Sequence, residues 1–195
     1  DKSGSVVGAV ESIRDITEQK KAAGLIETAL NERDRALTHL RRDLSDAQAY
    51  VETVLPEPLT TGPVQVDWKF LPCEGLGGDT FGYHWIDPDH FALFLIDVSG
   101  HGVGSALLSV SIANVLRSRN LSGTDYKKPC QVLKALNKAF SGDQHNDMFF
   151  TIWYGVFNLS SRILEYSSAG HPPAFLFSRF SDGSIRARQL STRNC

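Results

Sequence analysis

Two aspartates, each next to glycines, are the residues of this chain best suited to chemistry. Asp79 closes the Gly-Gly-Asp of the segment CEGLGGDTFG, and Asp97 opens the segment DVSGHG. The first segment reads as a turn before the strand FGYHWI, and Asp97 ends the strand HFALFLIDV. The turn DPDH between the two strands predicts a hairpin. Counting outward from that turn places Asp79 and Asp97 opposite each other, or one residue out of register.

Facing carboxylates need a cation or a proton between them. Cross-strand neighbours have Cβ atoms ~5 Å apart, and two carboxylates at that distance repel each other. An oxygen-rich pair is the kind of site that Mg²⁺ or Mn²⁺ prefers, and Gly77 and Gly78 allow tight backbone geometry beside it. The pattern therefore predicts a metal site. The alternative interpretation is an unrelated turn acid and strand-end acid.

The histidines offer a weaker case for catalysis. Ser99 and His101 are close in sequence, but no orienting acid or nucleophile-elbow motif accompanies them, so we do not predict a Ser-His pair. His101 either shapes the site or has a turn or hydrogen-bonding role. We expect His171, in AGHPP, to order a turn before a strand rather than to perform acid–base work. We expect the remaining histidines to be solvated or to lie in surface loops: His39, His84, His90 and His145.

The bulk properties exclude several classes of protein. The formal net charge of the 195 residues is -2, so no general affinity for nucleic acid or membrane is expected. The longest apolar stretch, FALFLIDV, is too short for a bilayer span, which needs ~20 residues. Cys73, Cys130 and Cys195 lack zinc-ligand spacing and are odd in number. A reduced, cytoplasmic setting follows as the expectation.

A long helix is predicted from about residue 17 to Leu55, where Pro56 and Pro58 prevent its continuation. Asp15 and Glu18 have the spacing of a capping box. Within the helix one row of residues recurs at alternating spacings of four and three: Ile26, Leu30, Arg33, Leu37, Leu40, Leu44, Ala47, Val51 and Val54. Such a seam is typical of a parallel dimeric coiled coil. The alternative is a helix that lies on the core of its own domain.

After Pro63 the pattern changes to strands and shorter helices. The alternating segment VQVDWKF predicts a first strand, before the hairpin described above. Helices are expected at 103–118 and 129–140, and strands at 148–158, 162–168, 173–178 and 185–190. This order predicts an α+β fold with mainly antiparallel sheets.

Four motifs in this order resemble the PPM metal-dependent serine/threonine phosphatases, in the SpoIIE-like bacterial subfamily that regulates sigma factors. They are LPCEGLGGDTFGYHWID, FALFLIDVSGHGVGSALLS, FFTIWYGVFN and YSSAGHPPAFLF. The resemblance implies an α-β-β-α sandwich with two or more Mn²⁺ or Mg²⁺ ions. It implies that Asp79, Asp97 and the backbone carbonyl of Val98 are metal ligands. A metal-activated water would then attack the phosphorus, without a side-chain nucleophile.

The resemblance also suggests how the chain is organised. The opening VVGAVESIRDITEQKKA is similar to the end of a PAS sensory domain. We therefore expect a PAS remnant at 1–16, a coiled-coil helix at 17–55 that forms a homodimer, and a partial phosphatase domain at 56–195. The family continues with a Ser/Thr-Asp-Gly motif whose aspartate completes the metal site, and the sequence ends at Cys195 before such a motif. The implied substrate is a phosphorylated anti-sigma-factor antagonist of the STAS type.

Two alternatives remain open. A catalytically incomplete phosphatase fold would act as a dimerisation and signal-relay module. A diguanylate cyclase also carries a Gly-Gly-Asp, but Thr80 stands where its second acid is required, and DVSGHG has no counterpart there.

Overall fold

The computed structural model describes residues 2, 4, 8, 14–71, 76–140 and 148–191. Contacts divide the chain into two compact units, Asp1–Asp43 and Leu44–Cys195. Most of the predicted PAS remnant at 1–16 lies outside the described residues. The domain boundaries thus stay a prediction.

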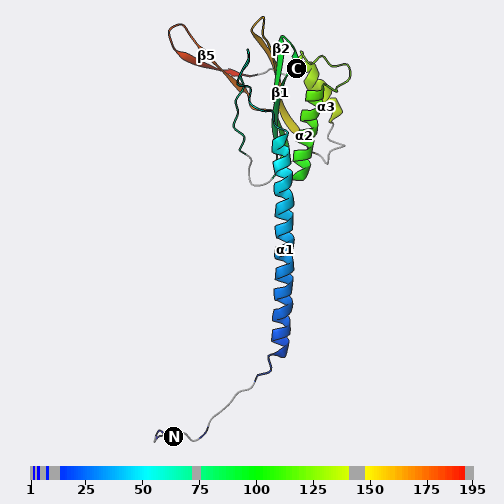
Figure 1. The fold of residues 1–195 in the computed structure, drawn as a ribbon, viewed down its shortest axis with the longest axis vertical. Coiled ribbons are helices and arrows are strands. Elements are labelled where there is room, and N and C mark those ends of the chain that lie inside the picture. Colours follow the sequence, from blue (N-terminus) through cyan, green and yellow to red (C-terminus); the bar gives the residue numbers. More distant parts are fainter. Residues whose placement is uncertain are drawn as a thin grey trace. The chain divides into compact units, whose positions relative to one another are not determined.

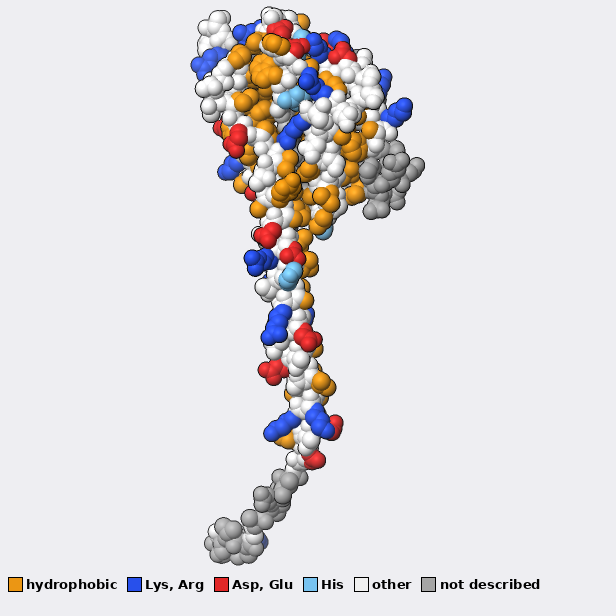
Figure 2. Space-filling model, turned by 45° about the vertical axis from the view of Figure 1, so that its right-hand side comes forward, with side chains coloured by type: hydrophobic (Ala, Val, Ile, Leu, Met, Phe, Trp, Pro, Cys, Tyr) orange, Lys and Arg blue, Asp and Glu red, His pale blue; other side chains and the backbone are white. Residues whose placement is uncertain are grey.

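The long helix is α1, Thr17–Thr53. The chain leaves α1 through a 3₁₀-type turn, in which the N–H groups of Val54 and Leu55 bond to carbonyls three residues earlier. At the other end, Asp15 accepts a hydrogen bond from the N–H of Thr17 (2.9 Å), while the side chain of Glu18 pairs with Lys21. The Asp15 half of the predicted capping box is therefore present, while Glu18 pairs with Lys21 instead of completing it. None of the side chains of α1 is buried, and apolar groups recur along the helix between charged ones (Figure 2).

A four-stranded antiparallel sheet forms the centre of the second unit, in the order β1-β2-β3-β4 (Figure 1). Its strands are β1, Gly77–Asp87; β2, His90–His101; β3, Phe150–Asn158; and β4, Ile163–Ala169. Residues alternate between the two faces of a strand, so in each strand one set faces the helices and the other set faces away. The α+β class with antiparallel pairing is confirmed.

Two helices cover one face of this sheet. Helix α2, Val103–Ser118, contacts β1 and β2, and α3, Pro129–Ala139, contacts β3 and β4. Pro129 occupies the first turn of α3, as expected for a residue without a backbone donor. Their apolar sides enclose a core with Phe94, Ile112 and Tyr154 fully buried. The hydroxyl of Tyr154 donates to the carbonyl of Tyr126 (2.9 Å), which satisfies its one polar atom within that core.

The segment VQVDWKF does not pair into a sheet, so the predicted first strand is wrong. Among the described residues, the backbone of this segment pairs through one isolated bridge, between Val66 and Leu59. The alternating burial is nevertheless present: Trp68 and Phe70 turn toward β1 and contact the ring of Phe81, with centroids 5.0 and 6.3 Å away. The apolar alternation reflects packing on an aromatic face, which does not require a ladder of hydrogen bonds.

A separate two-stranded sheet follows, formed by β5, Ala174–Arg179, and β6, Ile185–Leu190. Several of its apolar side chains are exposed, among them Phe175, Phe177 and Ile185. The guanidinium of Arg186 lies 4.2 Å from the ring centroid of Phe180 at the turn.

Three side chains bind the backbone just beyond α1. Arg117 of α2 donates to the carbonyl of Val54 (2.7 Å). The indole of Trp68 donates to the carbonyl of Pro56 (3.0 Å), and the hydroxyl of Tyr83 to that of Glu57 (2.6 Å). A cation at the end of a helix satisfies carbonyls that have no partner within the helix. The exit from α1 is thereby joined to α2 and β1.

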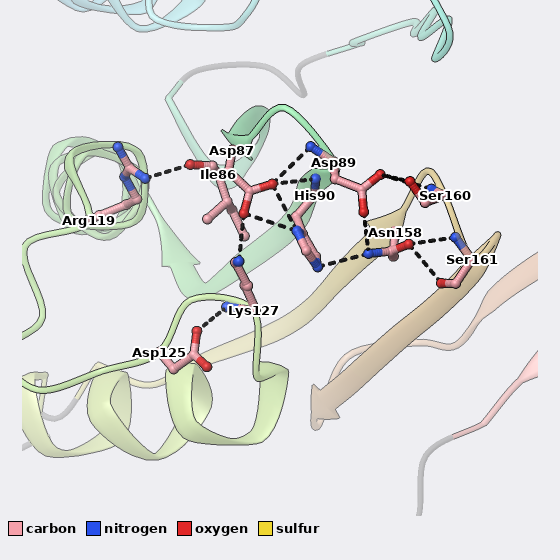
Figure 3. Close-up of polar contacts among 10 residues, drawn as sticks. All are labelled: Ile86, Asp87, Asp89, His90, Arg119, Asp125, Lys127, Asn158, Ser160 and Ser161. Carbon is pink, nitrogen blue, oxygen red and sulfur yellow. Dashed lines mark hydrogen bonds and ion pairs between the residues drawn. The ribbon is translucent and has the colours of Figure 1, made fainter.

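A polar network joins the β1–β2 turn to the β3–β4 turn (Figure 3). The carboxylate of Asp87 accepts hydrogen bonds from the N–H groups of Asp89 and His90 and from Nδ1 of His90 (2.8 Å), and it pairs with Lys127 (2.6 Å). The amide of Asn158 donates to Asp89 (2.8 Å) and contacts Nε2 of His90 (2.9 Å). His90 thus lies partly exposed at the β1–β2 turn and is a structural member of this network.

Asp87 supplies a pH-dependent part of the stability. Hydrogen bonds from Lys127 and His90 hold the pKa of its carboxyl well below the usual 3.8. A carboxyl whose pKa is lower in the folded state stabilises the fold above its unfolded pKa, and the contribution is lost as pH falls below about 4. We expect Asp87→Asn to lower the Tm by about 2–4 °C at pH 7, with a smaller difference at pH 3.

Thermal unfolding followed by circular dichroism between pH 3 and 7 measures this effect. The exposed Asp46, in α1, provides the matched control as Asp46→Asn. Equal melting curves for wild type and Asp87→Asn across the pH range would contradict the assignment.

Candidate active site

Asp79 and Asp97 are direct partners in the β1–β2 ladder, as the sequence predicted. Both side chains project from the face of the sheet that α2 and α3 do not cover. Their positions along the strands differ from the prediction. Gly77, Gly78 and Asp79 belong to β1 itself, not to a preceding turn, and β2 continues past Asp97 to His101. The pair therefore lies within the hairpin, held by strand backbone on both sides.

The ladder is irregular directly beside the pair. Gly77 pairs with His101 and Asp79 with Asp97, so β2 has two more residues than β1 between these pairs. A Cβ on Gly78 would lie 2.4 Å from the carbonyl oxygen of Val98. The strands approach here to a distance that only glycine allows. This brings the Val98 carbonyl, the third predicted ligand, into the irregular stretch beside the two carboxylates.

The pair is electrostatically unfavourable without a counter-charge. Burial raises the pKa of Asp79 above 3.8, and the neighbouring Asp97 carboxylate raises it further. His171 acts in the opposite direction on the pKa of Asp79. Like charges so close disfavour joint ionisation unless a cation or a proton intervenes.

His171 lies beside this pair, which the sequence did not predict. Its Nδ1 is 3.0 Å from the hydroxyl of Thr151, and Thr151 is the β3 partner of Asp97. Burial lowers the pKa of His171, and Asp97 and Asp79 act to raise it. The sequence signal that could have drawn attention to His171 is the motif AGHPP, in which a glycine directly precedes the histidine. Its proximity to the aspartates depends on β3, and the motif alone does not show it.

A groove of about 670 Å³ opens along the same face of the sheet. Asp79, Asp97 and His171 are among the residues that line it, and most of the other lining side chains are apolar, including Trp68 and Phe81. A carboxylate pair beside an apolar groove is the usual composition of a ligand site.

The remaining candidate residues lie apart from this chemistry. The hydroxyl of Ser99 accepts a hydrogen bond from the N–H of Phe149 (3.0 Å), so it has a structural role and forms no Ser-His pair. His101 is exposed at the end of β2. Thr80 is buried on the opposite face from Asp79, so a second acid there would face the core and could not join Asp79.

The other histidines divide into three cases. His39 is exposed on α1 and pairs with Asp43, as expected. His145 lies outside the described residues. His84 is largely buried in β1, and neither ring nitrogen has a hydrogen-bond partner. Burial, with Arg119 and Arg117 nearby, lowers its pKa to about 4, so its predicted surface position is wrong.

The oxygen donors fit part of a Mg²⁺ or Mn²⁺ site. Two facing carboxylates and a carbonyl are the hard ligands these ions take. Among the residues that the structure describes, no group of three or more His, Cys, Asp or Glu side chains could hold a metal ion. The described residues thus offer two acidic side chains at this place, and not a complete set of ligands. In the same residues, no helix is long and apolar enough to cross a membrane.

A match to a protein-family model over more than half of the chain shows the family of this protein. The family model described as stage II sporulation protein E (SpoIIE) matches residues 87–191. This chain belongs to the SpoIIE family. The matched range contains Asp97, Val98 and His171, while Asp79 lies just before it. The resemblance drawn from the four motifs is confirmed, and a diguanylate cyclase is excluded.

Curated relatives of this SpoIIE-family chain include two proteins of Bacillus subtilis (strain 168). Phosphoserine phosphatase RsbP is 30% identical over 138 residues, which cover 69% of this chain and 34% of the relative. Phosphoserine phosphatase RsbU is 31% identical over 135 residues, which cover 68% of this chain and 37% of the relative. The chain thus spans about a third of the length of these relatives.

Among solved structures, the SiaA-PP2C domain of Pseudomonas aeruginosa shares the fold. The TM-score is 0.58 at 17% identity, over 80% of this chain and 61% of that one. The expected phosphatase-type fold is thereby confirmed.

Proposed function

We propose that this chain carries a metal-dependent phosphatase site for phosphoserine or phosphothreonine on a regulatory protein. The observation that supports it is the facing pair Asp79 and Asp97 within a SpoIIE-family sheet. The curated relatives are named phosphoserine phosphatases, which agrees with hydrolysis at phosphorus.

Each residue of the site has a distinct task in this proposal. Asp79, Asp97 and the carbonyl of Val98 would hold Mn²⁺ or Mg²⁺. When bound, the ions supply charge neutralisation at the phosphoryl group and activate a water. The strand backbone holds both carboxylates in place before substrate arrives, so little reorganisation is needed. Ser99, whose hydroxyl is engaged with Phe149, takes no part as a nucleophile.

The proposed substrate is a phosphorylated anti-sigma-factor antagonist of the STAS type, in the cytoplasm. The relatives RsbP and RsbU support a phosphoserine substrate. The antagonist itself follows from the resemblance to sigma-factor regulatory phosphatases. The proposal includes no nucleic-acid or membrane partner.

Phosphate release measures the activity directly. A chain extended through the family's Ser/Thr-Asp-Gly motif is incubated with a serine-phosphorylated STAS protein and Mn²⁺. We expect release that requires the metal and leaves a phosphotyrosine peptide intact. Equal release in the presence of EDTA would overturn the proposal.

A second function, dimerisation and signal relay, is favoured by the exposed seam of α1. Ile26, Leu30 and Leu40 are 60%, 45% and 54% exposed. Apolar side chains at this spacing are normally covered by a second helix. We propose that residues 17–55 pair with a second copy as a parallel coiled coil.

Charged residues in the seam should separate the dimer. We expect the double variant Leu37→Glu, Leu44→Glu to be monomeric at micromolar concentration, because four like charges would meet in the interface. Sedimentation or light scattering gives the mass. Ser45→Glu with Ala49→Glu adds the same charge outside the seam and should stay dimeric. A wild-type monomer would rule out the coiled coil.

A further inference from the structure

Several contacts hold His171 in place at the end of β4. Gly170 has φ of +72°, a conformation that side-chain-bearing residues rarely adopt, and forms a parallel bridge with Ile152. A Cβ on Gly170 would lie 3.2 Å from Cγ2 of Thr151. The hydroxyl of Ser168 donates to the carbonyl of His171 (3.0 Å). Together these contacts seat His171 against Thr151 on β3.

The imidazole itself is held by a separate contact. The hydroxyl of Thr151 lies 3.0 Å from Nδ1, so Nε2 is the ring nitrogen left to face other groups. Thr151 is paired with Asp97, and Asp97 with Asp79, across three adjacent strands. Partners in an antiparallel ladder share one face. The ring lines the same groove as both carboxylates.

A turn-ordering role alone does not account for this arrangement. The turn after β4 is already defined by Gly170, by its bridge to Ile152 and by the hydrogen bond from Ser168 to the backbone. None of these contacts uses the imidazole. The Thr151 contact orients the ring and adds nothing that the backbone of the turn requires.

We propose that His171 is a positioning residue for the carboxylate pair. The Thr151 hydroxyl donates to Nδ1, which places the ring hydrogen on Nε2. With a cation bound to the pair, Nε2–H would donate to the carboxylate of Asp97. This orients Asp97 for a divalent cation while keeping its other oxygen available. The inference rests on the proposed metal site. Hydrogen bonds to ligating carboxylates are of the kind whose loss costs 10–100-fold in metal affinity.

Mn²⁺ binding to the 195-residue chain, measured by calorimetry, tests the role without an activity assay. We expect His171→Gln to weaken binding by about 10–100-fold and Thr151→Val by about tenfold. Thr151→Ser keeps the hydroxyl and should bind like wild type. Ser168→Ala removes a turn contact but leaves the imidazole and Thr151, and should also retain affinity. Circular dichroism establishes that each variant is folded.

The outcomes separate positioning from turn stability. Unchanged Mn²⁺ affinity in folded His171→Gln and Thr151→Val would overturn the inference. So would a loss in Ser168→Ala as large as that in Thr151→Val, because a structural role of the turn predicts equal losses.

Nitrogen NMR of the imidazole provides a second readout that needs no metal. We expect His171 as the Nε2–H tautomer in wild type, with its resonance shifted in Thr151→Val and in Asp97→Asn. An Nδ1–H tautomer would overturn the inference. If wild type fails to bind Mn²⁺, the proposed metal site fails in this chain, and the shift of the His171 resonance in Asp97→Asn still decides whether the ring faces Asp97.

Discussion

Asp97→Asn is expected to abolish Mn²⁺-dependent release of phosphate from a phosphoserine protein. Asp97 is one of two carboxylates that face each other at the irregular end of the β1–β2 hairpin. An amide keeps the shape but removes the negative charge that a divalent cation requires. Changes to groups that only contact metal ligands cost 10–100-fold, so removal of a ligand should cost at least about 100-fold in kcat/KM.

The measurement is phosphate release together with Mn²⁺ affinity, in the chain extended through the Ser/Thr-Asp-Gly motif. Asp46→Asn removes an acid from the exposed surface of α1 and should change neither quantity. Turnover and Mn²⁺ affinity in Asp97→Asn that both equal those of wild type would disprove the assignment of this site. A loss of Mn²⁺ affinity without loss of turnover would disprove the metal dependence alone.

Gly78→Ala should have the second-largest effect, on both stability and metal binding. The new methyl would lie 2.4 Å from the Val98 carbonyl oxygen and 3.0 Å from the Val98 Cβ. Backbone cannot swing aside as a flexible side chain does, so the two strands must separate where Asp79 and Asp97 meet. Overpacking of this kind costs typically 1–3 kcal/mol, and the displaced Val98 carbonyl should weaken Mn²⁺ binding as well.

The neighbouring glycine provides a matched control. A Cβ on Gly77 would meet one atom, the backbone nitrogen of Asp79, at 4.0 Å. Gly77→Ala should therefore leave the Tm and Mn²⁺ affinity close to those of wild type. If Gly77→Ala and Gly78→Ala behave alike, the close approach of Val98 is not what the glycine is needed for.

The facing of Asp79 and Asp97 was predictable because a hairpin obeys local counting. The turn DPDH sets the register, and the strand period of two then decides which residues are opposite. The ends of the strands were less predictable. Pairing continues through the glycines to Gly77 and His101, past an irregularity that no turn signal indicates.

Alternation of apolar residues proved a sound guide to burial and a poor guide to pairing. In the segment VQVDWKF the alternate residues do turn inward, as Trp68 does against Phe81. Whether such a segment also finds a hydrogen-bonding partner depends on a strand edge elsewhere in the chain. His84 was misjudged for a related reason, since its environment is set by Arg117 and Arg119, more than thirty residues away.

The sequence by itself determined the class of fold, the two helices over the sheet, the facing aspartates and the family, because each depends on local pattern or on motifs in order. Only the tertiary structure decided the place of His171. Its ring contacts Thr151, which is the β3 partner of Asp97. The physical reason is that contacts between strands distant in sequence follow from sheet order and register, and β3 is separated from β2 along the chain by both helices, α2 and α3.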